Sequence, residues 1–360
     1  MTNKGDLMKL SKDIVFLSGK RTPFGTFGGT VKDWSATDLA VVAAKAALAQ
    51  ANVRPEEVDH SIFGNALQTT ADAIYLARHV ALKSGCPQTV PALTLNRLCG
   101  SGFQSLVSAA EQLLLGEADI VLAGGTESMS TAPHVVRGAR WGLPLGKSNM
   151  GDLLWDALLD PYVDMPMAMT AEKLGEKYGI TREQCDVYAA RSQAAWKAAQ
   201  DAGRFENEVT PVEIKDRKGN VTAFKVDEHP RPQTTVETLA KLPPYFKKDG
   251  LVSAGNASGI SDGAGAMVMT TMEVANASFT STRSTWSRRM PVRSSARRIA
   301  GAGPIPMIDG SQPTIPHPRR RPIGFAPRAF ATSIVVITIA PAPSEMPEAL
   351  PAETSPSFLK

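Results

Sequence analysis

The chain has 360 residues and a formal net charge of +4, from 39 basic and 35 acidic residues. This length exceeds one ordinary domain, and no apolar run reaches the roughly 18 residues that a membrane-spanning helix needs. The first 13 residues mix Lys with Asp and contain no Arg, which predicts neither a transit peptide nor a secretory signal. Three cysteines without regular spacing argue against a disulfide framework, so we expect a cytoplasmic protein.

The first 130 residues alternate strands and helices. The expected strands are 14–18, 60–66, 90–95 and 119–123, and the expected helices are 37–51, 71–84 and a helix that opens after Cys99 and stops at Gly116. Strands separated by helices of this length predict an α/β domain whose mostly parallel sheet is covered on both faces.

The pattern loosens between residues 131 and 250, where we expect an inserted loop lobe. Its one strong helix, 182–202, begins at a capping box of Thr181 and Gln184, and a hairpin is expected near 218–220. Regular α/β character returns in residues 251–275, with a loop of small residues at 251–259 and a strand at 266–271. The expected domains are therefore 1–130, the lobe 131–250, the final part of the first domain at 251–275, and a tail.

The tail, residues 276–360, differs in composition from the rest. Residues 277–360 carry ten Arg and one Lys against four acidic residues, and 13 of the 26 prolines, whereas the preceding residues have a net charge of −3. The segment has no sustained helical periodicity, and its one strand-like stretch is 333–339. We expect this atypical Arg/Pro/Ser-rich tail to be disordered.

Cys99 is the strongest candidate for a nucleophile. It lies between the apolar stretch 90–95 and a periodic helix, and such a turn places a thiol beside the positive end of a helix dipole, which favours the thiolate. Gly100 and Gly102 let another backbone or a substrate approach closely. A lone cysteine is more often a small buried apolar residue, and we keep that interpretation for Cys86 and Cys185.

Six segments of the sequence, in order, match one known family. They are Lys20–Gly25, Asp72–Val80, Asn96–Gln104, Gly124–Ser130, Met165–Glu172 and Asn256–Gly259. Over about residues 13–275 the chain resembles the thiolases, and most closely the 3-ketoacyl-CoA thiolases (acetyl-CoA acyltransferases) of the mitochondrial type. The resemblance implies the thiolase-like layered α/β fold and a homo-oligomer, either a dimer or a tetramer.

The resemblance also implies a reaction. The Cys99 thiolate would attack C3 of a 3-ketoacyl-CoA, release acetyl-CoA and carry the acyl group until a second CoA removes it; the reverse is a Claisen condensation. The backbone N–H of the nucleophile helps to form an oxyanion hole in this family. CoA is then a substrate, and we expect neither a tightly bound cofactor nor a metal.

Substrate contacts carry over where the motifs match. By resemblance they are Met167 at the acyl channel, Ala254 and Ser258 along the pantetheine arm, and Arg231, Thr238 and Phe246 at the nucleotide end. A solvated charge at Arg231 and plain packing at Phe246 remain open alternatives. The histidines His60, His79, His134 and His229 have no catalytic match, and we treat them as structural or surface residues.

The tail departs from the family. The second half of a thiolase supplies an Asn-Glu-Ala-Phe segment, a Gly-His-Pro segment and a Cys followed by glycines, and residues 276–360 contain none of them. No Cys follows Cys185, and His317 lacks the glycine setting. The alternative function is therefore an impaired, truncated or frameshifted thiolase remnant that at most binds CoA or acyl-CoA. A nucleic-acid binder is disfavoured, because no aromatic platform accompanies the 319–321 arginine cluster, and we expect no membrane partner.

Overall fold

The computed structural model describes residues 11–146 and 150–278. Contacts divide the chain into two units, residues 1–274 with 335–360 and residues 275–334, and only the first four residues of the second unit are described. The expected disordered tail, the strand-like stretch 333–339 and His317 therefore lie outside the described residues.

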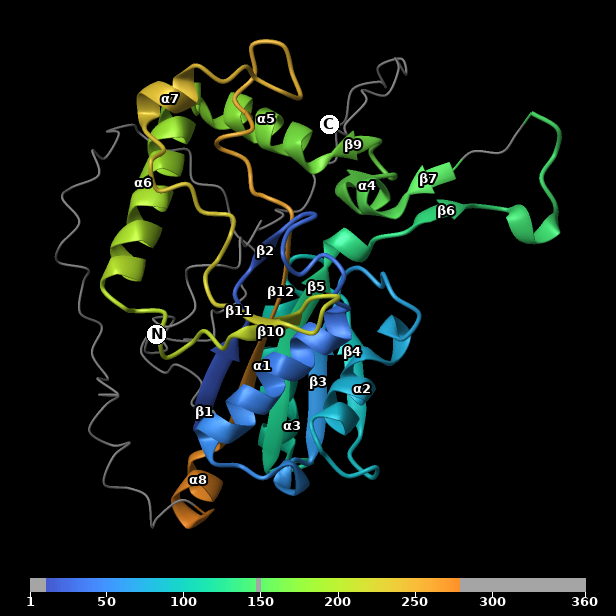
Figure 1. The fold of residues 1–360 in the computed structure, drawn as a ribbon, viewed down its shortest axis with the longest axis vertical. Coiled ribbons are helices and arrows are strands. Elements are labelled where there is room, and N and C mark those ends of the chain that lie inside the picture. The colour runs from blue at the N-terminus through green and yellow to red at the C-terminus, as the bar shows by residue number, and fades with distance from the viewer. Residues whose placement is uncertain (1–10, 147–149, 279–360) are drawn as a thin grey trace, which may run out of the picture. The chain divides into compact units, whose positions relative to one another are not determined.

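A mixed six-stranded sheet forms the centre of the first unit (Figure 1). The strand order is β1-β12-β5-β3-β4, with β2 paired to β12. The strands are β1 (Ile14–Arg21), β2 (Gly25–Thr26), β3 (His60–Gly64), β4 (Ala92–Leu95), β5 (Ile120–Ser128) and β12 (Ser261–Thr271). Only β3 pairs in parallel, with β4 and β5, whereas β12 is antiparallel to β1, β2 and β5. The strands β1, β2, β3, β4 and β5 therefore all run in one direction, as the mostly parallel sheet expected from the first 130 residues requires. In this sheet β12 runs the opposite way, because the chain returns from the lobe at the carboxyl end of β5.

Helices cover both faces of this sheet. α1 (Ala36–Ala51) and α2 (Leu76–Lys83) lie on one face, and α3 (Ser101–Leu115) lies on the other (Figure 1). The predicted stop at Gly116 is confirmed, since α3 ends there with φ 75°. Helix α1 begins one residue earlier than expected, because the Ser35 side chain caps it by accepting the Asp38 N–H. No helix in the described ranges is both long enough and apolar enough to cross a membrane.

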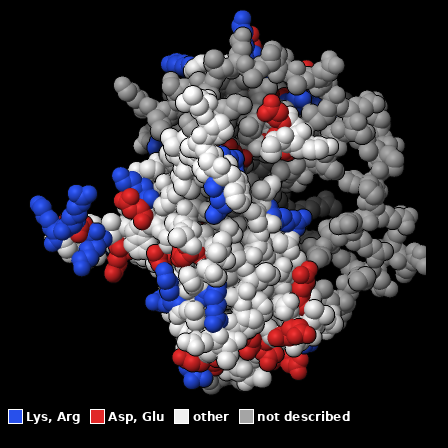
Figure 2. Space-filling view, turned by 90° about the vertical axis from the view of Figure 1, so that its right-hand side faces the viewer, with Lys and Arg blue, Asp and Glu red and all other residues white. Residues whose placement is uncertain are grey.

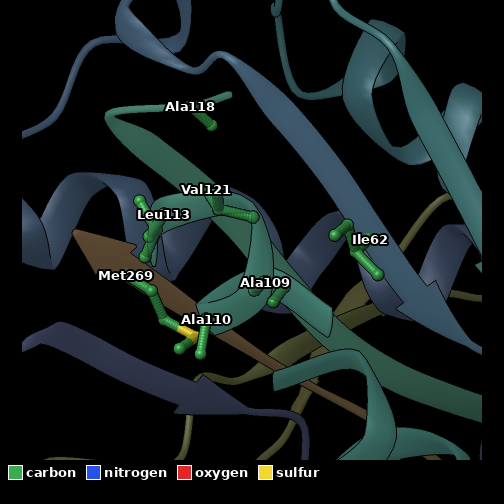
Figure 3. Packing of buried hydrophobic residues seen from close by; sticks show 8 residues of the cluster. Ile62, Ala109, Ala110, Leu113, Ala118, Val121 and Met269 are labelled. Atoms are coloured by element: carbon green, nitrogen blue, oxygen red, sulfur yellow. The ribbon is translucent and has the colours of Figure 1, made fainter. Parts of the chain in front are cut away.

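A hydrophobic cluster packs α3 onto the sheet. Its buried members are Ile62, Ala109, Ala110, Leu113, Ala118, Val121, Ala123 and Met269. Figure 3 shows side chains of α3 pointing toward Val121 of β5 and Met269 of β12. Successive residues of a strand face opposite sides, so Thr126 of β5 instead turns to α1, where its hydroxyl donates to the Ala36 carbonyl at 2.8 Å. Removal of this apolar surface from water holds α3 in place.

Residues 129–260 form a long excursion between β5 and β12. Its elements are β6 (His134–Val136), β7 (Met150–Asp152), α4 (Leu153–Leu158), β8 (Leu159–Asp160), β9 (Met165–Pro166), α5 (Met167–Tyr178), α6 (Arg182–Asp201), β10 (Val212–Lys215), β11 (Val221–Phe224) and α7 (Val236–Ala240), and α8 (Met272–Ser278) follows β12. Short 3₁₀ helices occur at Pro55–Glu57, Ala73–Tyr75, Met129–Thr131 and Ala139–Trp141. The capping box of Thr181 and Gln184 and the β10–β11 hairpin are present as predicted, while the domain boundaries stay predictions.

A buried arginine ties this excursion to β1. Arg21 donates from Nε to Glu208 at 2.8 Å and from Nη1 and Nη2 to the two oxygens of Asp227 at 2.7 and 3.1 Å. Its guanidinium also lies over the rings of Phe24 and Phe205, 4.9 and 5.4 Å from their centroids. Three charged groups removed from water are stable only together, so this cluster fixes where the excursion meets the sheet.

Other charged side chains lie at the surface. Figure 2 shows basic and acidic residues interspersed, with many uncharged residues between them, over the body of the described part on one face. Lys83 and Asp38, for example, form an exposed pair with a 2.8 Å separation between Nζ and Oδ1. Exposed pairs of this kind contribute little to stability, because water and salt screen them.

We expect Arg21→Ala to lower the free energy of unfolding by about 3–5 kcal/mol, because it leaves the carboxylates of Glu208 and Asp227 without their partner. Lys83→Ala is the matched control and should change stability by less than about 1 kcal/mol. Urea unfolding followed by circular dichroism measures both. Similar small losses in the two variants would contradict the role given to Arg21.

Candidate functional site

The predicted nucleophile and the predicted CoA-binding segment reach the same edge of the sheet. Cys99 follows the carboxyl end of β4, which runs parallel to β3, and β3 runs parallel to β5. The segment 251–259 precedes β12, whose first residues pair with the last residues of β5, as Asp262 does with Ser128. Carboxyl ends of parallel strands are where α/β sheets bind ligands. The topology therefore supports a site at this edge.

Glycines let the first turn of α3 lie directly on the strand ends. A Cβ atom at Gly64, the last residue of β3, would lie 2.3 Å from the carbonyl carbon of Ser101 and 2.7 Å from the nitrogen of Gly102. A Cβ atom at Gly125 of β5 would lie 2.7 Å from the Cα atom of Gly102. Real Cβ atoms are almost never found so close to other atoms, so positions 64 and 125 must be glycine for the helix to come this near.

The turn that carries Cys99 is strained and internally hydrogen-bonded. Leu98 has φ 50°, whereas the other non-glycine residues of positive φ in the described part are Asn or Asp. The Leu98 N–H donates to Asn96 Oδ1 at 2.8 Å, and the Ser101 hydroxyl donates to the Leu98 carbonyl at 2.6 Å and accepts from the Arg97 N–H. The predicted strand-to-helix turn is confirmed, and the Cys99 side chain at its tip is exposed.

Glu127 lies beside this turn at the end of β5. Its carboxylate accepts the backbone N–H groups of Ala66 and Leu67 and the side-chain amide of Asn65. Burial raises the pKa of Glu127 to about 7, against the opposing effect of the Ala66 and Leu67 hydrogen bonds. The sequence interpretation missed this residue, although it lies in the matching segment Gly124–Ser130 and is an acid at the end of a buried strand.

The other two cysteines differ from Cys99 in their surroundings. Cys86 is buried, and burial raises its pKa to about 11. Cys185 lies in α6, where burial and then the charges of Asp186 and Glu172 raise its pKa. Both effects disfavour the thiolate, which agrees with their interpretation as unreactive residues.

The predicted substrate contacts gather in the lobe. Arg231, Thr238, Ala254 and Ser258 are exposed, and Met167 and Phe246 are half-buried. The segment 251–259 lies against the stretch that holds Thr238 and Phe246, since the Tyr245 N–H donates to the Val252 carbonyl at 2.9 Å. Gly255 touches the same stretch, because a Cβ atom there would lie 2.3 Å from the Leu239 side chain.

Two polar side chains hold the segment 251–259: the buried Glu172, and Asn256 from within the segment. Glu172 of α5 accepts the N–H groups of Leu251 and Val252 at 2.8 and 2.7 Å. The Asn256 side chain donates to the Leu251 carbonyl at 2.9 Å and to Asp186 of α6 at 2.8 Å. Helix α5, which begins at Met167, is thereby joined to the predicted pantetheine segment.

An ion pair extends this network to α7. Arg182 donates from Nε to Asp186 at 2.8 Å and from Nη2 to the carbonyls of Leu239 and Leu242 at 2.8 and 3.0 Å. The sequence interpretation assigned no role to Arg182 or Asp186. Asn256 could have been found, since it opens the matching segment Asn256–Gly259.

Arg231 and the histidines are placed as follows. The Arg231 guanidinium turns back onto its own chain and donates to the carbonyls of Glu228 and His229 at 2.7 and 3.0 Å. The His229 ring packs on Gly259, where a Cβ atom would lie 1.5 Å from Nε2. This brings the Arg231 stretch to the end of the segment 251–259. Among the described residues, no hydrogen bond joins this segment to the Cys99 turn.

His60 and His79 lie outside both the Cys99 turn and the segment 251–259. His60 begins β3, the end opposite Cys99, and burial lowers its pKa. His79 stacks on Tyr75, with Nδ1 3.5 Å from Asp72. Within residues 11–146 and 150–278, no three His, Cys, Asp or Glu side chains gather closely enough to hold a metal ion.

Comparison with known proteins decides the family. The family model described as the thiolase N-terminal domain matches residues 14–273, most of the chain. The chain belongs to the thiolase family. The resemblance and the fold class expected from the sequence are therefore confirmed, and the described residues comprise the part of the fold that carries Cys99.

Individual thiolases are also similar to this chain in sequence and structure. Human mitochondrial 3-ketoacyl-CoA thiolase is 52% identical over 306 residues, covering 84% of this chain and 76% of the relative. Beta-ketothiolase BktB from Cupriavidus necator is 45% identical over 261 residues, covering 72% of this chain and 66% of the relative. The crystal structure of the human mitochondrial enzyme in complex with CoA has a TM-score of 0.72 and 54% identity, covering 76% of this chain and 68% of that chain.

We expect Gly64→Ala to destabilise this thiolase by about 1–3 kcal/mol, because its methyl group would push α3 off the end of β3. Gly102→Ala is the matched control. A Cβ atom there would find Gly125 Cα as its nearest neighbour, at 3.8 Å, an ordinary contact. Thermal unfolding compares the two, and equal losses would show that the close approach is not what requires glycine.

Glu127 should make stability depend on pH. Its folded pKa of about 7 lies above its ordinary value of 4.5, so the folded state binds the proton more tightly. The stability that this group contributes is present below the ordinary value and lost as pH rises through about 7. Relative to Glu127→Gln, the wild type should lose about 3 kcal/mol between about pH 4 and pH 8, measured by urea unfolding. A constant difference across this range would contradict the shift.

Proposed function

We propose that this thiolase transfers acyl groups between 3-ketoacyl-CoA and CoA through Cys99. The observation that carries the proposal is the exposed thiol in the turn just before α3, at the sheet edge that the segment 251–259 also reaches. It is supported by relatives named 3-ketoacyl-CoA thiolase and acetyl-CoA acetyltransferase, and by a solved human relative that holds CoA.

The reaction follows from a thiolate at this position. Sulfur attacks the C3 carbonyl of the substrate, the C2–C3 bond breaks, and the electron pair at C2 takes a proton as acetyl-CoA leaves. The acyl group stays on Cys99 as a thioester until the sulfur of a second CoA attacks it, and the CoA proton balances the one taken at C2. The backbone N–H of Cys99 is our candidate donor to the developing oxyanion.

CoA would lie along the segment that the buried network supports. We assign Ala254 and Ser258 to the pantetheine arm and Met167 to the acyl chain, since α5 and this segment are joined through Glu172. Thr238 and Phe246 would meet the nucleotide end together with Arg231. CoA acts here as a substrate, with no tightly bound cofactor proposed.

A second candidate is binding of acyl-CoA without turnover. It is favoured by the sequence after residue 276, which lacks a second Cys and the Gly-His-Pro segment that thiolases use for proton transfer. General acid–base groups contribute about 10²–10⁴ in rate, so their loss would leave an acyl group stranded on Cys99. This candidate and thiolysis share the first covalent step and differ in the second.

A homo-oligomer of two or four chains and a cytoplasmic location are further proposals. The thiolase family supports the first, and sedimentation of the purified chain tests it. The second rests on the cysteine content of the sequence, while several relatives are named mitochondrial.

CoA-dependent cleavage of acetoacetyl-CoA tests the function directly. We expect turnover by the full 360-residue chain and a loss of at least about 10³-fold in Cys99→Ala, because the covalent step needs the thiol. Cys185→Ala is the matched control and should keep the wild-type rate. Turnover in Cys99→Ala would exclude the proposed nucleophile. A Cys99 that takes up an acyl group but does not pass it to CoA would favour the second candidate.

A further inference from the structure

The segment 64–67 contacts the Cys99 turn on both of its sides. Before Cys99, the Asn65 N–H donates to the Leu95 carbonyl at 3.0 Å, and the Asn96 side chain donates to the Ala66 carbonyl at 3.1 Å. After Cys99, Gly64 lies against the backbone of Ser101 and Gly102. A displacement of this segment would therefore move both ends of the turn.

The Glu127 carboxylate is what fixes the segment. It accepts three N–H groups from three successive residues: the side-chain amide of Asn65, and the backbone N–H groups of Ala66 and Leu67. The Asn65 amide also donates to the Thr126 carbonyl at 2.9 Å. Two adjacent residues of β5, Thr126 and Glu127, therefore hold the segment. A charged acceptor for several N–H groups is a strong anchor.

The turn needs such an anchor because it is strained. Leu98 is held at φ 50°, which is unfavourable for a bulky residue, and its N–H is bound by Asn96 Oδ1. The same Asn96 side chain reaches the Ala66 carbonyl, so one residue links the strained position to the segment that Glu127 fixes. Strained backbone persists only where its surroundings hold it.

We propose that Glu127 is a positioning residue for Cys99, which it holds at the start of α3 through the segment 65–67 and Asn96. The inference rests on the proposed function, in which Cys99 carries the acyl group. Glu127 touches neither the thiol nor, on this account, the substrate. Its loss should slow the covalent step and leave CoA binding unchanged.

Glu127→Gln is the first test variant. Its side-chain NH2 group would face at least one of the N–H groups that donate to the carboxylate, and two donors cannot form a hydrogen bond with each other. Asn96→Ser is the second: its short hydroxyl can still accept the Leu98 N–H, but it cannot reach the Ala66 carbonyl. Glu111→Gln, at an exposed position of α3, is the matched control. All are compared at about pH 8, above the folded pKa of Glu127.

Two readouts separate positioning from general loosening of the fold. Peptide mass spectrometry follows the acylation of Cys99 by acetoacetyl-CoA and the alkylation of all three cysteines by iodoacetamide, and calorimetry measures CoA binding. We expect acylation of Cys99 to slow about 10- to 100-fold in Glu127→Gln and about fivefold in Asn96→Ser. The Kd for CoA and the alkylation of buried Cys86 should stay within about twofold of the wild type.

Three results would overturn the inference. They are wild-type rates of Cys99 acylation and alkylation in Glu127→Gln, an equal loss in Glu111→Gln, and a parallel rise in Cys86 alkylation, which would indicate unfolding. If wild-type Cys99 takes no acyl group, the proposed function fails. The alkylation rates of Cys99 then still decide whether Glu127 positions it, with a several-fold change expected and equality overturning the inference.

Discussion

The close approach of α3 to the ends of β3 and β5 is the constraint on which the rest of the site depends. Gly64 and Gly125 have no side chains, so the first turn of the helix lies on the strand ends with Cys99 at the tip of the preceding turn. The hydrophobic cluster beneath α3 supplies the attraction, and the glycines set how near the helix can come. A larger residue at either glycine would shift Cys99, the proposed nucleophile, together with the helix.

Two polar systems complete this arrangement at the same edge of the sheet. Glu127 anchors the segment beside the Cys99 turn, while Glu172, Asp186 and Asn256 hold the segment 251–259 in the lobe. The Arg21 cluster fixes the later part of the same lobe, at Glu208 and Asp227, to β1. The Cys99 turn and the predicted CoA contacts are thus supported by polar side chains that take no part in the proposed reaction.

Local sequence signals predicted much of this. Caps such as Thr181, the stop at Gly116 and the strand-to-helix turn at Cys99 depend on a few neighbouring residues, and all are confirmed. The strand at 266–271 was predicted, but its direction was not, because strand direction depends on where a long excursion returns and not on residues within the strand. Glu127 was missed for a similar reason, since its partners lie some 60 residues away along the chain.

The central claim is that this thiolase fold presents Cys99, alone among its cysteines, as an acyl carrier. Incubating the full chain with acetoacetyl-CoA and mapping acylated peptides by mass spectrometry tests it most directly. The account predicts an acyl group on Cys99 and none on Cys86 or Cys185, whose thiolates are disfavoured by burial. Acylation of Cys185 in place of Cys99, or a folded chain with no acylated cysteine, would contradict it.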